Sequence, residues 1–371
     1  MLVKTNSVKE LGLDLEGINH TNQKEEIKMN RKFASEIVMV EDSAVAINNY
    51  CIEKGWSDGL PIIPPTEQEV ERMMSGTKRD PADVVASIPP WWGEATIEKI
   101  AINAVMAGCL PEYMPVIITA LEAMSEERFG LDAIQPTTHP VAPLMIVNGP
   151  IAEKLDINSE CGAFGPGWRS NATIGRAIRL ILLNIGGAFP GKLDMSTQGQ
   201  PSKYTYCIAE NEKDSPWEPL HVEKGFDAST STVTMVAAEN PHNIYEHIAK
   251  TGEELLFSIC NALTSTGSNN VLFQDGSPII ALCPEHAATI TASGFSKNDV
   301  RAYIHEKARI PLKHFLKEVI DKFYSGWEEN ALVPITARKE NIVVIVVGGP
   351  GKHSAYIPTT APPSVTRIIL D

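Results

Sequence analysis

The chain has 371 residues, of which 43% are apolar and 21% charged, the composition of an ordinary globular protein. Its 46 acidic and 32 basic residues give a net charge of −14, which argues against nucleic-acid binding because such proteins usually carry a basic patch. No apolar run approaches the roughly 18 residues that a membrane helix needs, and no signal-peptide pattern opens the chain, so no membrane association is expected.

The N-terminal part of the chain alternates between charged, helical and proline-rich stretches. Residues 1–36 mix charges of both signs and predict a poorly ordered leader. A helix is expected over about 42–54, and the stretch 57–65 that follows is not helical because prolines and a glycine interrupt it. Thr66 then has the features of an N-cap for a helix that ends near Gly76.

The middle of the chain predicts helices on either side of a strand. Apolar residues at helical spacing follow Thr96 and stop at Gly108, and Pro111 opens a second helix that runs to Met124. An apolar extended segment, 143–147, comes next, and another helix is expected over about 171–185. This alternation of strands and helices is typical of an α/β fold.

The later part of the sequence repeats the earlier pattern. Pro143–Ala152 lines up with Pro278–Ala287, and Gly175–Ala177 lines up with Val300–Ala302 in a later helix. A third strand of the same type is expected over 341–347. The identity is low, so the similarity is either a chance match or the remnant of a helix–strand–turn–helix duplication.

We therefore predict an α/β fold, a mixed sheet with flanking helices, in two related halves. The expected organisation is the leader (1–36), a first α/β half (37–200) with a glycine-rich loop, and a second α/β half (201–371). In α/β folds, ligands gather beyond the carboxyl ends of the strands. All three predicted strands end in turns with glycine or proline, so the functional surface is expected at these turns.

A glycine-rich loop, 161–167, precedes the helix predicted over 171–185. Glycines let a backbone approach a ligand, a helix N-terminus attracts anions, and an arginine there can hold a carboxylate through two hydrogen bonds. A tight turn with an exposed arginine that pairs with an acidic neighbour is the alternative. The loop matches neither a P-loop nor a dinucleotide fingerprint. The residues expected to bind substrate here are Gly165, Gly167, Arg169, Ser170 and Asn171.

Two further strand-end turns carry candidate catalytic groups. His286 is expected in the first turn of a helix that begins at Pro284, where the helix dipole favours the neutral imidazole of a general base or metal ligand. Glu285 is the neighbouring acid–base group. After the third strand, Lys352 can neutralise a substrate anion and His353 can move protons. The alternative is that these side chains are incidental to the turns.

The connection 210–221 and two cysteines complete the candidates. Long connections often close over sites, so Trp217 and His221 are candidate substrate-binding residues. Cys109 and Cys161 are candidate thiols, although a packing role is the ordinary one for such cysteines. The six cysteines form no CxxC motif, which is consistent with a reducing cytoplasm.

Three phrases, Ala101–Cys109, Gly165–Ala172 and Gly348–His353, resemble a widespread, poorly characterised bacterial family. The resemblance covers about residues 42–371. Relatives in that family are associated with a small UGSC-motif (seleno)protein domain, which is similar to parts of the glycine-reductase type selenoproteins. This chain contains neither UGSC nor CGSC. The resemblance therefore implies either that a reactive thiol or selenol belongs to a small partner subunit and that a carbon–heteroatom bond is cleaved, or that the function is independent of that domain.

The leading hypothesis is a cytoplasmic enzyme, a lyase or a reductive-cleavage oxidoreductase, that acts on a small anionic, carboxylate-type substrate. A non-catalytic binding or scaffold subunit of a larger complex is one alternative. A mononuclear metal hydrolase is another, with ligands drawn from His139, His221, His286 and His353. The patterns identify no cofactor, and an oligomer is expected.

Overall fold

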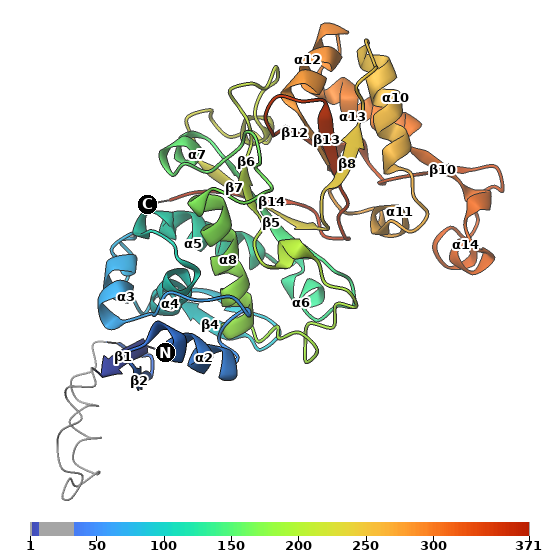
Figure 1. Cartoon of the computed structure of the whole chain (residues 1–371). Coiled ribbons are helices and arrows are strands. Elements are labelled where there is room, and N and C mark those ends of the chain that lie inside the picture. The colour runs from blue at the N-terminus through green and yellow to red at the C-terminus, as the bar shows by residue number, and fades with distance from the viewer. Residues whose placement is uncertain (1, 7–32, 371) are drawn as a thin grey trace, which may run out of the picture.

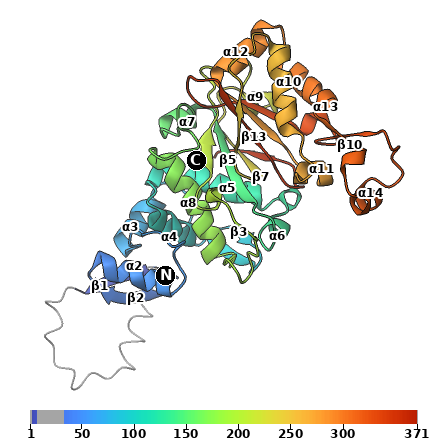
Figure 2. The same ribbon diagram turned by 45° about the vertical axis from the view of Figure 1, so that its right-hand side comes forward.

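The computed structural model describes residues 2–6 and 33–370. Two four-stranded sheets lie face to face, and helices cover the outer side of each (Figure 1). Figure 2 shows the same order from a second direction, with α4, α5 and α8 on one side and α10, α12 and α13 on the other. The chain has the predicted α/β fold with mixed sheets and flanking helices.

The first sheet has the strand order β14–β7–β5–β6. Its central strand β5 (Ala142–Asn148) is parallel to β6 (Cys207–Ala209) and antiparallel to β7 (Thr232–Ala238). The edge strand β14 (Val365–Ile368) pairs with β7 in the antiparallel sense.

The second sheet has the order β12–β9–β13–β8 and the same pattern of directions. Its strand β9 (Ile279–Leu282) is parallel to β12 (Val343–Val346) and antiparallel to β13 (His353–Ile357). The edge strand β8 (His242–Tyr245) pairs antiparallel with β13. The strand arrangement thus agrees with the predicted relation between two halves.

Side chains of β5 and β9 alternate between two cores, as the period of a strand requires. Leu144 of β5 and Ile279 of β9 belong to the core between the sheets. Met145 and Ile280, the next residues, face the outer helices of their own halves. The alignment of Pro143–Ala152 with Pro278–Ala287 therefore places equivalent side chains on equivalent faces.

The two sheets exchange one strand each. β8 follows β7 directly in the chain but pairs in the second sheet, and β14 follows β13 but pairs in the first. β6 and β7 both come after residue 200 and still belong to the first sheet. The boundary predicted between residues 200 and 201 therefore falls inside the first sheet, because strand pairing is decided by contacts far apart in the chain.

Helices α4 (Ile97–Ala107), α5 (Met114–Met124) and α8 (Arg169–Asn184) cover the first sheet. As predicted, the helix α4 starts directly after Thr96, whose hydroxyl accepts a hydrogen bond from the Lys99 N–H. Also as predicted, α4 ends at Gly108, whose φ of 92° favours glycine. The local sequence therefore predicts both ends of α4 correctly.

Helices α10 (Gly252–Leu263), α12 (Pro284–Ala292) and α13 (Lys297–Lys307) cover the second sheet. The shorter elements are α6 (Leu131–Ile134), α7 (Pro150–Lys154), α9 (Leu220–Glu223), α11 (Asn269–Phe273), α14 (Lys317–Phe323), β10 (Arg309–Pro311) and β11 (Leu332–Pro334). No helix in the described ranges has the length and apolar character needed to cross a bilayer.

The N-terminal elements pack beside the first half. Strand β1 (Leu2–Asn6) pairs in parallel with β2 (Ile37–Glu41), so part of the predicted leader is an ordered strand; residues 7–32 lie outside the described residues. Helices α2 (Ala44–Glu53) and α3 (Glu67–Met74) follow. The hairpin of β3 (Val84–Ile88) and β4 (Gly93–Thr96) leads into α4.

Candidate functional site

The turn after β12 contacts the glycine-rich loop and the residues just before it. The Gly348 N–H donates to the Ser159 carbonyl over 2.8 Å, which joins the turn after β12 to the glycine-rich loop. A Cβ on Gly349 would lie 2.7 Å from the Cβ of Cys161, so the two backbones are in close contact. The contact leaves no space for a ligand between these two residues.

Arg169 is exposed at the start of α8, but its guanidinium already has a partner. Its Nε and Nη2 donate to the Gly108 carbonyl over 3.0 and 2.9 Å. This carbonyl ends α4, so Arg169 caps the negative end of that helix. The predicted carboxylate anchor is thus used to join two helices.

Helix α8 begins at Arg169, two residues before the predicted start, with Trp168 as its N-cap, so Ser170 and Asn171 lie in its first turn. Asn171 is buried, and its amide accepts from the Asn158 N–H over 2.8 Å and donates to the Asn158 carbonyl over 2.9 Å. The Ser170 hydroxyl donates to a carbonyl of the same preceding segment. Both side chains fix the loop before the helix.

Gly165 and Asn171 line a cavity of about 350 Å³ beneath the glycine-rich loop, together with Tyr206. Gly167 has a φ of 129°, and a Cβ there would meet only open space. Glycine at this position therefore serves the backbone conformation.

His286 is buried, and both of its ring nitrogens have partners. Nε2 lies 2.9 Å from the Glu246 carbonyl, and Nδ1 lies 2.7 Å from the Ser354 hydroxyl. Burial lowers the pKa of His286, so its neutral form is favoured, with burial rather than the helix dipole as the main cause. The ring connects α12 to β13 and has no free nitrogen for proton transfer.

The other predicted catalytic residues lie on the same side of the second half but have separate partners. The exposed Glu285 carboxylate accepts from the Gly351 N–H. The ammonium of Lys352 donates to the His247 carbonyl over 3.4 Å, and His353 Nδ1 contacts the side-chain oxygen of Asn243 at 3.0 Å. The contacts stabilise the turn 348–352 and do not converge with Arg169.

The connection 210–221 is packed into the molecule instead of closing over a site. The Trp217 indole N–H donates to the Phe295 carbonyl over 3.2 Å. His221 is fully buried, and its Nδ1 lies 3.8 Å from a carboxylate oxygen of Glu212. Trp217 thus joins the connection to the loop before α13, whereas His221 contacts residues of the connection itself and of the segment that follows it.

The candidate thiols differ in exposure. Burial raises the pKa of Cys109 to about 12, and its thiol donates to the Thr173 carbonyl over 3.2 Å, as expected of a packing cysteine. Cys161 is exposed. Of the candidate metal ligands, His139 lies 3.0 Å from Glu239, and within 2–6 and 33–370 no three His, Cys, Asp or Glu side chains form a metal-binding group.

A cavity of about 610 Å³ lies beside α8, and we name it the α8 cavity. The chain surrounds it with three segments, 55–58, 189–194 and 198–204, and with one face of α8. Its lining combines buried charges with aromatic and aliphatic groups. The lining residues are Gly55, Ser57, Asp58, Arg179, Leu183, Phe189, Pro190, Asp194, Gln198, Gly199, Gln200, Pro201, Lys203 and Tyr204.

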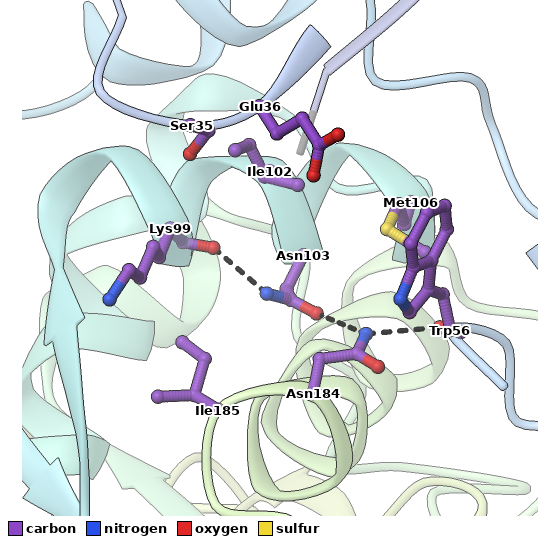
Figure 3. A pocket seen from close by; sticks show the side chains of 9 residues that line it. All are labelled: Ser35, Glu36, Trp56, Lys99, Ile102, Asn103, Met106, Asn184 and Ile185. Atoms are coloured by element: carbon purple, nitrogen blue, oxygen red, sulfur yellow. Dashed lines mark hydrogen bonds between the residues drawn. The ribbon is translucent and has the colours of Figure 1, made fainter. Parts of the chain in front are cut away.

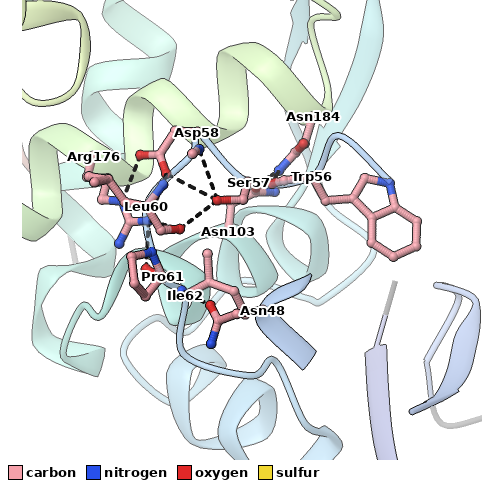
Figure 4. Close-up of polar contacts among 11 residues, drawn as sticks. Asn48, Trp56, Ser57, Asp58, Leu60, Pro61, Ile62, Asn103, Arg176 and Asn184 are labelled. Carbon is pink, nitrogen blue, oxygen red and sulfur yellow. Dashed lines mark hydrogen bonds and ion pairs between the residues drawn. The ribbon is translucent and has the colours of Figure 1, made fainter. Parts of the chain in front are cut away.

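Two ion pairs border the α8 cavity. Arg176 Nε and Nη2 each donate to an oxygen of Asp58 over 2.8 Å, and Nη2 also reaches the Pro61 carbonyl, as Figure 4 shows. This pair fixes the segment 57–62 against α8. On another wall, the Lys203 ammonium lies 2.5 Å from Asp194. Burial lowers the pKa of Lys203, and the hydrogen bond to Asp194 opposes this shift.

Arg179 is the third cation, and no carboxylate of the described residues forms an ion pair with it. It is 7% exposed, and its Nε donates to the Lys203 carbonyl over 2.7 Å. Among residues 2–6 and 33–370, no atom accepts a hydrogen bond from its two terminal nitrogens. Burial lowers the pKa of Arg179, an effect that the nearby charges of Asp194 and Asp58 oppose. The set of three cations and two carboxylates thus has one uncompensated positive charge.

A smaller cavity, of about 300 Å³, lies on the Trp56 side of the segment 55–58 (Figure 3). Its polar wall is a chain of amides, in which Asn184 Nδ2 donates to Asn103 Oδ1 over 2.8 Å and to the Trp56 carbonyl over 3.0 Å. The Lys99 ammonium donates to the Glu94 carbonyl over 2.9 Å. This cavity contains no charge as deeply buried as Arg179, so the α8 cavity is the stronger candidate.

The sequence patterns pointed to Arg169 and not to Arg179, Arg176 or Lys203. The missed signal was a charge inside an apolar run, because Arg179 interrupts 177–183, whose other residues are alanine, isoleucine and leucine. A charged residue at such a position faces the interior of a helical fold and requires a partner there.

Comparison of the chain with models of protein families, with curated proteins and with solved structures gave no match.

Proposed function

We propose that this chain binds a small carboxylate-type anion in the α8 cavity, with Arg179 as the anchor. The observation that carries the proposal is Arg179, a 7% exposed side chain that lines a cavity of about 610 Å³ and whose two terminal nitrogens have no acceptor among the described residues. Burying an unpaired charge is costly, whereas a carboxylate at this position would compensate it.

The donor set suits a carboxylate. A guanidinium presents two parallel N–H groups that match the two oxygens of a carboxylate. Lys203 uses one of its three N–H donors for Asp194, so two others remain for a bound anion. The predicted substrate class is kept in this proposal, but the anchor moves from Arg169, which caps α4, to Arg179.

The predicted reaction, cleavage of a carbon–heteroatom bond with a thiol or selenol partner subunit, stays a prediction, as do the scaffold-subunit and metal-hydrolase alternatives. Native mass spectrometry of the protein purified anaerobically from its host tests the partner. A co-purifying small subunit would support the predicted complex, and a bare chain or homo-oligomer would contradict it.

Isothermal titration tests the binding role. We would titrate the wild-type protein with a panel of small aliphatic, hydroxy and aromatic carboxylates, each matched by its neutral amide. At least one acid should bind, and its amide should bind far more weakly. Replacement Arg179→Met should weaken acid binding by about 30-fold or more, as expected when one partner of a buried charge pair is removed.

Arg169→Met is the matched control, since it makes the same substitution on the same helix at a guanidinium that donates to Gly108. It should leave the affinity for the acid unchanged. Equal loss of affinity in both variants, or binding of amides as strong as that of acids, would overturn the proposal.

A further inference from the structure

We infer that the ligand of the α8 cavity is a monocarboxylate with an aromatic or alicyclic ring, and that the ring packs against Phe189 and Tyr204. This inference rests on the proposed function and specifies its substrate class. It is drawn from the charged and apolar groups that share the cavity wall.

Helix α8 gives the cavity a charged end and an apolar end. Arg179 and Leu183 both line it and are four residues apart, so they lie on one face of the helix, separated by about 6 Å along its axis. A carboxylate held by Arg179 would therefore extend its body toward Leu183. A ligand of only two carbon atoms would leave the apolar end unfilled.

The apolar part of the lining consists mainly of rings. Phe189, Pro190 and Tyr204 line the cavity, and Gly55 lies close to the Phe189 ring, 3.9 Å from the position of an added Cβ. The Trp91 ring packs against Phe189 at 5.4 Å between centroids. Tyr204 is 50% exposed although it lines the cavity. A ring on the ligand would cover these faces in the tilted or offset contacts that aromatic groups prefer.

The charge favours a monoanion. The three cations Arg176, Arg179 and Lys203 face the two carboxylates Asp58 and Asp194, and one negative charge from the ligand makes the set neutral. A dianion such as a phosphate monoester would leave an excess negative charge beside the buried Asp194. A single carboxylate on a ring satisfies both the charged end and the apolar end.

Titration calorimetry with three probes tests the inference: benzoate, acetate and the neutral benzamide. Benzoate should bind the wild-type chain at least about tenfold more tightly than acetate, because its ring buries apolar area that acetate lacks. Phe189→Ala should weaken benzoate about tenfold and leave acetate unchanged. Tyr204→Ala, a change at a half-exposed ring, should act in the same direction. Phe257→Ala, at a phenylalanine that is 63% exposed on α10, is the matched control and should change neither affinity.

The outcomes separate the two proposals. Equal affinities for acetate and benzoate, both lost in Arg179→Met, would overturn the ring inference and keep the carboxylate site. The same conclusion would follow if Phe189→Ala and Tyr204→Ala left benzoate binding unchanged. Absence of binding by both acids, or benzamide binding as tightly as benzoate, would overturn the proposed function itself.

Discussion

At the scale of single residues, the arginines of α8 show that burial alone does not define a role. Arg176 and Arg179 are three residues apart in α8, so they are neighbours on the helix surface. Arg176 forms two hydrogen bonds with the carboxylate of Asp58, whereas Arg179 donates to the Lys203 carbonyl and, among the described residues, to no carboxylate. The first is a structural ion pair, and the second is a cation whose terminal nitrogens have no acceptor in that part of the chain.

This difference predicts opposite effects on stability. Arg176→Met should lower the free energy of unfolding by about 3–5 kcal/mol, because it leaves Asp58 buried and unpaired. Arg179→Met should change it by less than about 1 kcal/mol or raise it, since loss of one hydrogen bond is offset by removal of an unpaired buried charge. Urea unfolding of the ligand-free variants measures both. A loss as large for Arg179→Met as for Arg176→Met would mean that the chain itself compensates Arg179.

Glu246 supplies a pH-dependent contribution at the same scale. Its carboxylate accepts from the Ser258 hydroxyl and from the N–H groups of Ile248 and Ala249, and these hydrogen bonds lower its pKa from 4.5 to about 2. A carboxyl whose pKa is lowered by folding stabilises the native state above the unfolded pKa, and the contribution is lost as pH falls from about 4.5 toward 2.

Glu246→Gln should therefore be less stable than the wild type at pH 6, and the difference should shrink at pH 3. Urea unfolding at the two pH values gives the comparison, with Glu53→Gln, at an exposed carboxylate of α2, as control. A stability difference that is the same at both values would show that the carboxylate charge is not what the three donors stabilise.

At the scale of elements, the turn after β12 depends on a close approach that only glycine allows. An added Cβ at Gly349 would lie 2.7 Å from the Cβ and 3.0 Å from the Cα of Cys161, so a backbone must move. The neighbouring hydrogen bond from Gly348 to Ser159 holds the same two loops together. The turn therefore joins the second sheet to the glycine-rich loop of the first half.

Gly349→Ala should lower the free energy of unfolding by about 1–3 kcal/mol, the usual cost of overpacking. Gly267→Ala is the control, because a Cβ there would meet only the Ser265 hydroxyl at 3.9 Å, and its effect should stay within about 0.5 kcal/mol. Chemical denaturation of the two variants provides the measurement. If Gly349→Ala and Gly267→Ala are equally stable, the turn after β12 and the glycine-rich loop can move apart without lowering the free energy of unfolding.

At the scale of the whole molecule, the exchange of β8 and β14 links the two sheets. Strand β8 follows β7 of the first sheet in the chain but forms an edge of the second sheet. Strand β14 follows β13 of the second sheet but forms an edge of the first. A shared core of apolar side chains, including Leu144 and Ile345, fills the space between the sheets. Unfolding of one sheet therefore removes both an edge strand and half of a core from the other.

We expect one cooperative unfolding transition for the chain. In urea, far-UV circular dichroism and tryptophan fluorescence should give coincident midpoints. Replacing Trp217 and Trp327 by Phe restricts the fluorescence to the four tryptophans of the first half, and the midpoints should still coincide. Two separated transitions in this variant would indicate that the halves unfold independently.

Much of the fold follows from local signals in the sequence. Thr96 and Gly108 mark the ends of α4, and Thr66 caps α3, because caps and left-handed glycines depend only on residues within one turn. The alternation of strands and helices predicted the α/β class, and the similarity of 143–152 to 278–287 predicted equivalent strands. The start of α8 was predicted about two residues too late, because the side chains of Ser170 and Asn171 bond to the loop before the helix and not to its own first turn.

The sequence by itself determined the element types, most of their ends and the internal similarity, since these depend on neighbours in the chain. Only the tertiary structure decided which sheet receives β8 and β14 and which arginine has no ion-pair partner among the described residues. The Arg176–Asp58 bonds join residues 118 positions apart, and the Arg169–Gly108 bonds join residues 61 apart. No local pattern reports such pairings, because a charge becomes paired or unpaired only when distant segments pack together.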